Sequence, residues 1–343
     1  MKRIKFGVAL PTCREGTHFP ADFSSPQSIV DTARTAEVLE YDSVWTNDHI
    51  LTLSYIRNKK VLSVPPNYYE SLTTLSYLAG VTDRVQLGAG VIILPLRHPI
   101  VLAKQISTLD VYSGGRLILG VGLGAYKEEF RAVRPGMSGR DRVLLYEEEI
   151  RALSKLLSED NATFNGEYIK FADVEMFPKP IQKPFPIYIG GNSLKGVKRA
   201  AEFGGGWHPG SLLPNELEER LEIMKEHAKK THRDFSSIDI APQFYVSIGK
   251  SHDEAIKNFR ASVTYKHIES LMVSTLRDQG MERYEKGEGI LLGTSGEVIE
   301  QIEEYIKVGV THFAAIVFVG VQNIQQLVDS MELFSEEVIP SFR

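Results

Sequence analysis

Residues 85–130 read VQLGAGVIILPLRHPIVLAKQISTLDVYSGGRLILGVGLGAYKEEF, and this stretch decides the fold class. An apolar run over residues 85–94 is followed by a helical pattern, a Ser-Gly-Gly stop and a second apolar run over residues 117–121. Short runs that are apolar throughout indicate strands buried on both faces, so the segment predicts a βαβ unit of a parallel sheet. Glycines cluster toward the C-terminal ends of both strands, where parallel α/β proteins bind ligands.

The same alternation of apolar runs and helical patterns continues through nearly the whole chain. It predicts strands at residues 4–10, 43–46, 85–94, 116–121, 186–189, 206–208, 238–248 and 312–318. It predicts helices at residues 27–39, 68–80, 99–111, 142–157, 194–203, 217–230, 252–277, 296–308 and 323–334. Strands that alternate with helices in this way are typical of an α/β fold, a (β/α)8 TIM barrel, and a doubly wound sheet is the structural alternative.

The chain is long enough for insertions in the strand-to-helix loops, because it has 343 residues and such a barrel needs about 250. We expect the insertions at residues 51–66, 160–183 and around 280–293, where they would shape the mouth of the barrel. No internal repeat, low-complexity tract or linker interrupts the pattern. We therefore expect a single domain over residues 1–343.

Composition narrows the partners and the compartment. The 39 basic and 44 acidic residues give a net charge of -5 without a basic stripe, which argues against nucleic acid or an anionic membrane as partner. Cys13 is the only cysteine, so no intrachain disulfide can form, and we expect an inert buried thiol. No apolar segment precedes the first strand or approaches the roughly 20 residues that span a bilayer. We therefore expect a cytoplasmic protein with no membrane partner.

Residues 120–125, GVGLGA, follow a predicted strand and fit the dinucleotide fingerprint G-x-G-x-x-A. That fingerprint requires a helix to begin at once and an acidic residue about 20 residues further on, at the end of the next strand. Residues 126–139 are charged and interrupted by Pro135, and the acidic residues 147–149 lie inside a predicted helix. We therefore reject a dinucleotide-binding fold. The glycines predict either the close approach of a bulky planar ligand or a tight turn.

Residues 45–49, WTNDH, stand at the end of the second predicted strand, and in a barrel this end belongs to the catalytic face. His49 would supply an imidazole that titrates near neutral pH, and the adjacent Asp48 would raise or fix its protonation. The alternative is structural: Asp48 caps a turn and His49 packs against the rim.

Two further glycine-rich segments follow predicted strands. Gly190, Gly191, Asn192 and Ser193 precede a helix, where free backbone N–H groups and the helix N-terminus suit a phosphate. N-capping by Asn192 or Ser193 is compatible with that role. Residues 204–209, GGGWHP, predict either a wall against an aromatic ring system or a structural tryptophan. The nine histidines form no HxH or HExxH spacing, so we expect no metal site.

Several strings of the sequence resemble the bacterial luciferase-like flavin and deazaflavin oxidoreductases, the luciferase-like monooxygenase superfamily. They are LPLRHPIVLAKQISTLDVYSGGRLILGVGLG followed by EEF, then PKPIQKPFPIYIGGNS, RAAEFGGGWHP and LLGTSGEVIEQIEEYIKVGVTHF, and they cover the chain almost end to end. Trp45, Asp48 and His49 form a Trp-x-x-Asp-His pattern that is most similar to the coenzyme F420-dependent branch. The resemblance implies a TIM barrel, and a homodimer is expected for the family.

The resemblance also implies roles for individual residues. Gly90 and Val91 match a bulge, often with a non-proline cis peptide, that supports the central ring of the cofactor. Gly122 and Gly124 match a loop beside the ring, and residues 190–193 match the segment that holds the cofactor phosphate.

One position departs from a branch of the family. In the sugar-phosphate dehydrogenases of the superfamily, a catalytic glutamate follows the second glycine of the loop that Gly122 and Gly124 match. Ala125 stands at that position in this chain, so the oxidation of glucose 6-phosphate is not expected.

The function implied by the resemblance is hydride transfer between coenzyme F420 and an organic small-molecule substrate. His49 is the expected acid/base and Asp48 the group that holds it. The rival is an FMN-dependent monooxygenase that uses O2, and either enzyme could work with a separate flavin or F420 reductase. The two cofactors are hard to distinguish from sequence, because both present a planar tricycle and a phosphate. A third alternative is a catalytically idle barrel that binds flavin.

Overall fold

The structure is a computed structural model, and it describes residues 3–52, 56, 64–272 and 287–343. The strands of its main sheet are β1 (Lys5–Ala9), β2 (Ser43–Thr46), β3 (Gln86–Ile93), β4 (Leu117–Gly122), β7 (Ile187–Gly190), β8 (Gly206–His208), β9 (Asp239–Ile240), β10 (Gln243–Ile248), β11 (Leu291–Gly293) and β12 (His312–Phe318). A separate hairpin consists of β5 (Asn161–Asn165) and β6 (Lys170–Glu175).

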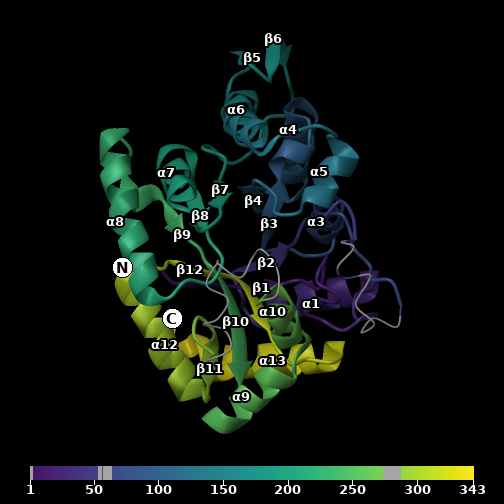
Figure 1. Cartoon of the computed structure of the whole chain (residues 1–343), viewed down its shortest axis with the longest axis vertical. Helices are drawn as coiled ribbons and strands as arrows, with labels where there is room; N and C mark the ends of the chain where they lie inside the picture. The colour runs from purple at the N-terminus through teal and green to yellow at the C-terminus, as the bar shows by residue number, and fades with distance from the viewer. Residues whose placement is uncertain (1–2, 53–55, 57–63, 273–286) are drawn as a thin grey trace.

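The helices surround the main sheet (Figure 1). They are α1 (Pro26–Val38), α3 (Ser71–Ala79), α4 (Pro99–Tyr112), α5 (Lys127–Val133), α6 (Gly139–Ser158), α7 (Leu194–Phe203), α8 (Pro214–Lys230), α9 (His252–Ala261), α10 (Val263–Met272), α12 (Ser295–Val308) and α13 (Ile324–Glu337). Short 3-10 turns lie at η1 (Leu94–Leu96), η2 (Phe235–Ser237) and η4 (Ile339–Phe342).

The main sheet closes on itself as a parallel barrel. Its strand order runs β11-β10-β12-β1-β2-β3-β4-β7-β8-β9, and its ladders are parallel. β9, at one end of this order, and β10, next to the other end, are one stretch of chain, interrupted by Ala241 and Pro242. Asp239 pairs with β8 on one side, and Gln243 pairs with β12 on the other. The predicted TIM barrel is therefore confirmed, and the doubly wound alternative is wrong.

The core has two parts that follow the alternation of side chains along each strand. One set of buried side chains packs between the strands and the helices, and another fills the barrel. The inner set includes Ala9, Trp45 and Ile118. Trp45 pairs with Gly88 across the ladder, and a side chain on Gly88 would collide with the indole ring. The glycine in β3 therefore makes room for the large tryptophan of β2.

The predicted elements agree with the observed ones except at identifiable points. The predicted strand 238–248 is split at Pro242, which has no N–H to give to a ladder. The predicted helix 252–277 breaks at Ser262 into α9 and α10, and its residues 273–277 lie outside the described part of the chain. The short helix α5 was not predicted, so the argument that no helix begins directly after the strand-four glycines is wrong.

The three predicted insertions have different outcomes. Residues 160–183 contain the antiparallel hairpin of β5 and β6, which projects beyond α6 at the top of the molecule (Figure 1). Residues 51–66 lie mostly outside the described residues, and so do 280–286 of the third insertion. The described remainder of that third insertion contains β11, which extends the sheet beside β10.

Candidate active site

The predicted site residues lie at the carboxyl ends of four neighbouring strands. Asp48 and His49 follow β2, and Gly90 and Val91 lie in β3. Gly122 and Gly124 are at the end of β4, and the segment 190–193 ends β7. Because β2, β3, β4 and β7 are consecutive in the sheet, the fold gathers these segments along one arc of the barrel mouth.

The bulge expected in the third strand is present. The peptide bond between Gly90 and Val91 is cis, and the register of β3 against β4 shifts between Ala89 and Ile92. Val91 keeps partial exposure in a strand whose central residues are otherwise buried. The chain therefore turns one aliphatic side chain toward the mouth of the barrel at this point.

Two glycines of the predicted cofactor site border the Val91 side chain. A Cβ atom added to Gly122 would lie 2.5 Å from Val91 Cγ2, and one added to Gly190 would lie 2.9 Å from Val91 Cγ1. Either side chain would force Val91 to move. Gly124 is one step removed: it has a φ of 74° and approaches Ile93 and Phe130 instead. The glycines of β4 and β7 thus form a niche for the bulge of β3.

Asp48 does not hold His49, and this corrects the predicted pairing. Its carboxylate accepts hydrogen bonds from Arg97 Nη1 at 2.6 Å, from Arg97 Nη2 at 2.8 Å and from the Ile93 N–H at 2.8 Å. Arg97 also pairs with Glu70 at 3.1 Å. Burial by itself lowers the pKa of Arg97, but the charges of Asp48 and Glu70 outweigh it and raise that pKa. Asp48 therefore anchors the chain that leaves β3.

The carboxylate beside His49 belongs to Glu129 of α5. His49 Nδ1 lies 3.4 Å from Oε1 and 3.5 Å from Oε2 of this buried glutamate. The Ile50 N–H donates to Glu129 Oε1 at 2.8 Å, which fixes the carboxylate against the loop after β2. The His49 ring also has Tyr68 and Tyr126 as neighbours, with centroids at 5.8 and 5.4 Å. Sequence reasoning missed Glu129, although it belongs to the EEF string after the strand-four glycines.

The segment 190–193 is organised around the N-terminus of α7. Ser193 is the N-cap, and its hydroxyl accepts the Gly196 N–H at 3.1 Å. Asn192 Oδ1 accepts the Gly210 N–H at 2.8 Å. Gly191 has a φ of 107°, and a Cβ added there would meet nothing within 4 Å. N-capping by Ser193 is thus confirmed, and phosphate binding at this helix N-terminus stays a prediction.

The GGGWHP segment places His208 against Trp45 inside the barrel and Trp207 in the core between the strands and the helices. Trp207 is fully buried, and its Nε1 donates to Gly191 O at 3.0 Å. His208 stacks on Trp45 with ring centroids 4.9 Å apart. Its Nδ1 lies 2.6 Å from Ala241 O, and burial lowers the pKa of His208 to about 4. His208 is therefore neutral at physiological pH.

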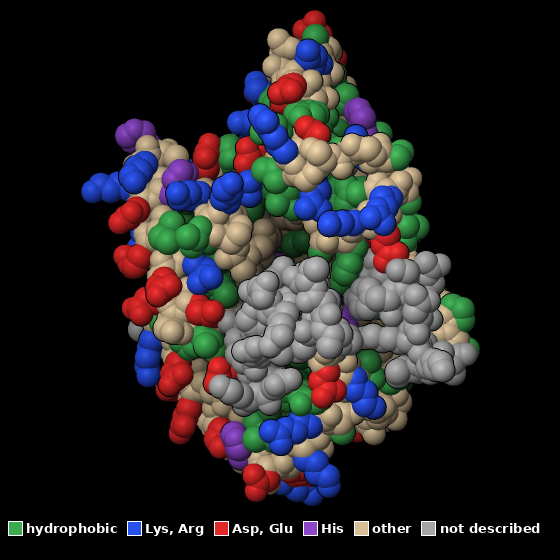
Figure 2. Space-filling model, viewed as in Figure 1, with side chains coloured by type: hydrophobic (Ala, Val, Ile, Leu, Met, Phe, Trp, Pro, Cys, Tyr) green, Lys and Arg blue, Asp and Glu red, His purple; other side chains and the backbone are tan. Residues whose placement is uncertain are grey.

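A basic pocket of about 190 Å³ lies beside the strand-four loop. Four cationic side chains line it: Lys127, Arg131, Arg134 and Arg142. Helix α6 begins at its wall. Arg142 Nη1 donates to Gly124 O at 3.1 Å, which ties the pocket to the predicted cofactor loop. Figure 2 shows Lys and Arg side chains gathered over this part of the surface.

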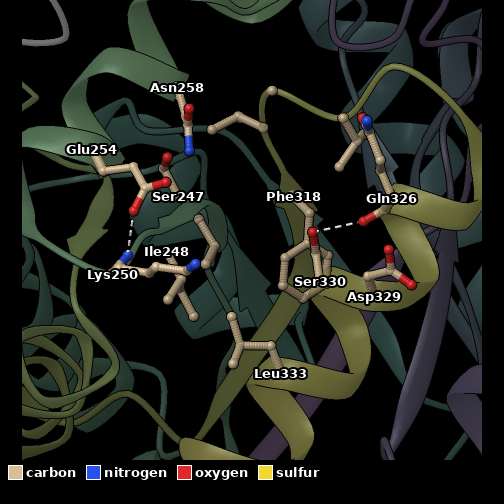
Figure 3. Close-up of a pocket in the computed structure, with 14 residues that line it drawn as sticks. Ser247, Ile248, Lys250, Glu254, Asn258, Phe318, Gln326, Asp329, Ser330 and Leu333 are labelled. Carbon is tan, nitrogen blue, oxygen red and sulfur yellow. Dashed lines mark hydrogen bonds between the residues drawn. The ribbon is translucent and has the colours of Figure 1, made fainter.

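A larger cavity of about 590 Å³ lies outside the barrel, between α9 and α13 (Figure 3). Its floor includes Ile248, Phe318 and Leu333, and Lys250 and Asp329 stand on its walls. It contains none of the predicted site residues. The candidate active site is therefore the mouth of the barrel rather than this groove.

In residues 3–52, 56, 64–272 and 287–343, no group of three or more His, Cys, Asp and Glu side chains is placed to hold a metal ion. None of the described helices is both long and apolar enough to cross a bilayer. Cys13 is buried, and burial raises the pKa of its thiol to about 12, which agrees with the inert thiol expected from the sequence.

A parallel barrel with a cis-peptide bulge in its third strand and a His–Glu pair at its mouth defines a TIM-barrel enzyme site. Residues 4–312 match the model of the luciferase-like monooxygenase family. The chain belongs to this family and is an enzyme of the luciferase-like type.

Known relatives differ in the cofactor they use. The F420-dependent glucose-6-phosphate dehydrogenase of Amycolatopsis mediterranei (strain U-32) is 28% identical over 340 residues, which cover 94% of this chain and 96% of that protein. The FMNH(2)-dependent dimethylsulfone monooxygenase of Pseudomonas putida is 34% identical over 143 residues, which cover 41% of this chain and 39% of that protein. The crystal structure of monooxygenase RslO1 from Streptomyces bottropensis superposes with a TM-score of 0.80 at 22% identity and covers 99% of this chain and 100% of that one.

Proposed function

We propose that this protein transfers a hydride between coenzyme F420 and an organic small-molecule substrate at the mouth of the barrel. The observation that carries the proposal is the bulge at Gly90 and Val91, whose Val91 side chain sits in the niche that Gly122 and Gly190 leave open. It presents a partly exposed aliphatic surface on which a planar ring can rest. The proposed cofactor fits this feature, because a deazaflavin brings a flat tricycle.

The phosphate of the cofactor fits the charge at one side of the same arc. The N-terminus of α7 provides N–H groups and a partial positive charge beside Gly191, where the space is open. The basic pocket that Arg142 connects to Gly124 lies at the neighbouring strand end. We propose that residues 190–193 hold the phosphate and that the basic pocket favours anionic parts of the cofactor further out.

His49 is the proposed acid/base. The bound deazaflavin supplies the hydride chemistry, and the protein exchanges the accompanying proton with the substrate. With Nδ1 turned toward Glu129, the ring nitrogen left for proton transfer is Nε2. Glu129 acts through His49 as a positioning residue, because its carboxylate, fixed by the Ile50 N–H, orients the imidazole. Asp48, predicted as catalytic, is proposed to position the bulge strand through Arg97 and Ile93.

Coenzyme F420 is favoured over FMN by the extent of the similarity. The F420-dependent relative aligns over 94% of this chain, whereas the FMN-dependent relative aligns over 41%. The runner-up is an FMN-dependent monooxygenase that uses O2 and a separate reductase, and the identity of 34% in the shorter alignment supports it. Ala125 remains the reason not to propose glucose 6-phosphate as substrate, despite the name of the longer match.

A fluorescence titration of the apoprotein with F420 and with FMN tests the proposal. We expect F420 to bind more tightly than FMN, and tight FMN binding with no F420 binding would refute the leading function. Gly122→Ala places a Cβ 2.5 Å from Val91 and should weaken F420 binding. Gly80→Ala, at the C-terminus of α3, is the matched control, because a Cβ there meets only Tyr77 O at 3.6 Å, an ordinary contact.

We also propose, from the family resemblance, that the enzyme is a cytoplasmic homodimer with one domain per chain. A separate flavin or F420 reductase would regenerate the cofactor. Sedimentation equilibrium of the purified protein measures its oligomeric state, and a monomer at micromolar concentration would contradict the proposed homodimer.

A further inference from the structure

Arg14 lies inside the mouth of the barrel, in the loop that follows β1. Only 1% of its surface is exposed, and its Nη2 lies 3.4 Å from Gln243 Oε1. Gln243 and Tyr245 alternate along β10 with Phe244, whose ring packs against Tyr305 of α12 outside the barrel. Gln243 and Tyr245 therefore point inward, and the guanidinium reaches them across the barrel mouth.

The groups that face Arg14 are neutral. Tyr245 offers a hydroxyl, which lies 3.0 Å from His18 Nε2. Burial and the charge of Arg14 hold the pKa of His18 well below its usual value. Burial lowers the pKa of His208 to about 4 and raises that of the Cys13 thiol to about 12. Of these described groups, Arg14 is therefore the cation at neutral pH, and His18, His208 and Cys13 are neutral.

The carboxylates of the region have other partners. Glu15, the next residue in the chain, accepts the Ser24 N–H at 2.6 Å and the Asn67 N–H at 2.8 Å. Asp48 is bound by Arg97, and Glu129 accepts the Ile50 N–H. Within the described residues, no carboxylate pairs with Arg14, and its Nε has no hydrogen-bond partner.

A buried cation without a counter-ion is costly, and such a charge is normally paired or hydrogen-bonded. Burial lowers the pKa of Arg14 to about 10, so it still carries its charge at pH 7. The planar guanidinium matches a carboxylate with two parallel hydrogen bonds. We propose that Arg14 is the receptor for a carboxylate group of the substrate. This inference rests on the proposed function, because it places the substrate at the same mouth.

The position of Arg14 connects it to the reacting groups. Its charge acts on His208, and a Cβ added to Gly90 would lie 2.8 Å from His208 Nε2. Its charge also acts on His18, on which His49 acts as well. A carboxylate held by Arg14 would therefore orient the rest of the substrate between the ring support at Gly90 and the imidazole of His49.

The test uses the apoprotein, with benzoate as the carboxylate probe and benzamide as its neutral isostere. Calorimetric titration should show that benzoate binds more tightly than benzamide. Arg14→Met should weaken benzoate binding by about tenfold or more, since a hydrogen bond to a charged group contributes about 1.5–3 kcal/mol. Arg14→Lys should retain part of the affinity. Arg151→Met, on the exposed face of α6, is the control and should bind benzoate as the native protein does.

Thermal unfolding separates a binding role from a structural one. Removing an uncompensated buried charge should leave the apoprotein of Arg14→Met at least as stable as the native protein. A lower Tm for Arg14→Met would make Arg14 structural and overturn the proposal. So would equal binding of benzoate and benzamide, no binding of benzoate, or equal benzoate affinity in the native protein and Arg14→Met.

Two further arms identify the source of the anion. Glucose 6-phosphate and inorganic phosphate, titrated in the same way, should bind more weakly than benzoate, and tighter binding of either would replace the carboxylate with a phosphate and overturn the proposal. The cofactor titration is independent of these measurements. If F420 fails to bind while benzoate binding still depends on Arg14, the proposed function is lost and the anion receptor stands.

Discussion

Arg97 and Arg14 lie at the same end of the barrel, but among the described residues only Arg97 is paired with carboxylates. Arg97 is bound by Asp48 through two hydrogen bonds and also pairs with Glu70. Arg14 is more deeply buried and has only the Gln243 amide, at 3.4 Å, among the described residues. The difference indicates that Arg97 stabilises the fold, and it supports the proposal that Arg14 binds a carboxylate of the substrate.

Two adjacent carboxylates on α6 repeat this contrast. Glu148 accepts the N–H groups of Glu167, Tyr168 and Ile169 at 2.7–2.9 Å, and these hydrogen bonds hold its pKa below the ordinary value against the effect of burial. Glu149 is buried without a hydrogen-bond partner in the described structure, and its nearest cation, Arg134 Nη2, is 3.9 Å from Oε1. Burial outweighs this charge and raises the pKa of Glu149 to about 9. The pKa values of these two neighbouring residues thus shift in opposite directions, because Glu148 accepts hydrogen bonds from the turn at residues 167–169 and Glu149 does not.

The largest expected effect comes from breaking the ion pair between Asp48 and Arg97. Asp48→Ala leaves Arg97 buried beside only Glu70 and leaves the Ile93 N–H without its acceptor. We expect the free energy of unfolding to fall by about 3 kcal/mol, measured by urea titration. Asp48→Leu combined with Arg97→Met should recover at least half of this loss, because no unpaired charge remains. A loss below about 1 kcal/mol for Asp48→Ala would show that the pair is not the anchor of this region.

The second-largest expected effect concerns His49, whose neighbouring carboxylate is that of Glu129. His49→Ala should lower kcat by roughly 100-fold and leave F420 affinity largely intact. Glu129→Gln should lower kcat less than His49→Ala does, because the amide that replaces the carboxylate still offers an oxygen to His49 Nδ1. If His49→Ala abolishes F420 binding while turnover per bound cofactor is unchanged, His49 is structural.

The fold and the positions of the glycines could be predicted from sequence, because both depend on local patterns. Fully apolar runs identify parallel strands, and the resemblance placed the bulge at Gly90 and Val91, where the structure has it. The hairpin of β5 and β6 was predicted only as an insertion, since its strands are exposed and alternate weakly.

The pairing of charges could not be predicted, because it depends on contacts between distant segments. Asp48 and His49 are adjacent in sequence, but their partners come from positions 49 and 80 residues further along the chain. Arg14 lies 229 residues from Gln243. A neighbour in sequence is therefore a poor guide to the partner of a side chain in a barrel mouth.

The pair Glu148 and Glu149 predicts opposite dependences of stability on pH. Glu149 has a raised pKa, so its ionisation in the unfolded chain reduces stability as the pH rises from about 4.5 toward about 9. Glu149→Gln should therefore gain stability relative to the native protein at pH 8, by roughly 1–2 kcal/mol after allowance for water penetration, and little at pH 4.5. Glu148 has a lowered pKa, so it stabilises the fold above its ordinary pKa, and this contribution is lost as the pH falls through its folded pKa.

Urea unfolding at pH 4.5, 6 and 8 measures both variants. Glu148→Gln should lose about 1 kcal/mol at pH 8 and at pH 6, and less at pH 4.5, where the carboxyl group of the unfolded chain begins to protonate. Parallel pH dependences for Glu148→Gln and Glu149→Gln would contradict the contrast, because they would mean that the turn at residues 167–169 does not distinguish the two carboxylates.

The smallest expected effect concerns the N-terminus of α7, where backbone N–H groups rather than a charged side chain would bind the anion. Ser193→Ala removes the N-cap of α7, and Ser138→Ala removes that of α6, so each should cost about 1 kcal/mol in urea unfolding. If the N-terminus of α7 binds the cofactor phosphate, Ser193→Ala should also weaken F420 binding by about twofold to threefold, since a frayed first turn aligns its N–H groups less well. Ser138 lines the basic pocket, so Ser138→Ala should weaken F420 binding less than Ser193→Ala does, because it removes none of the four cations there. Equal weakening by both variants would move the phosphate toward the basic pocket, where Arg142, rather than a helix terminus, would then be the anion's partner.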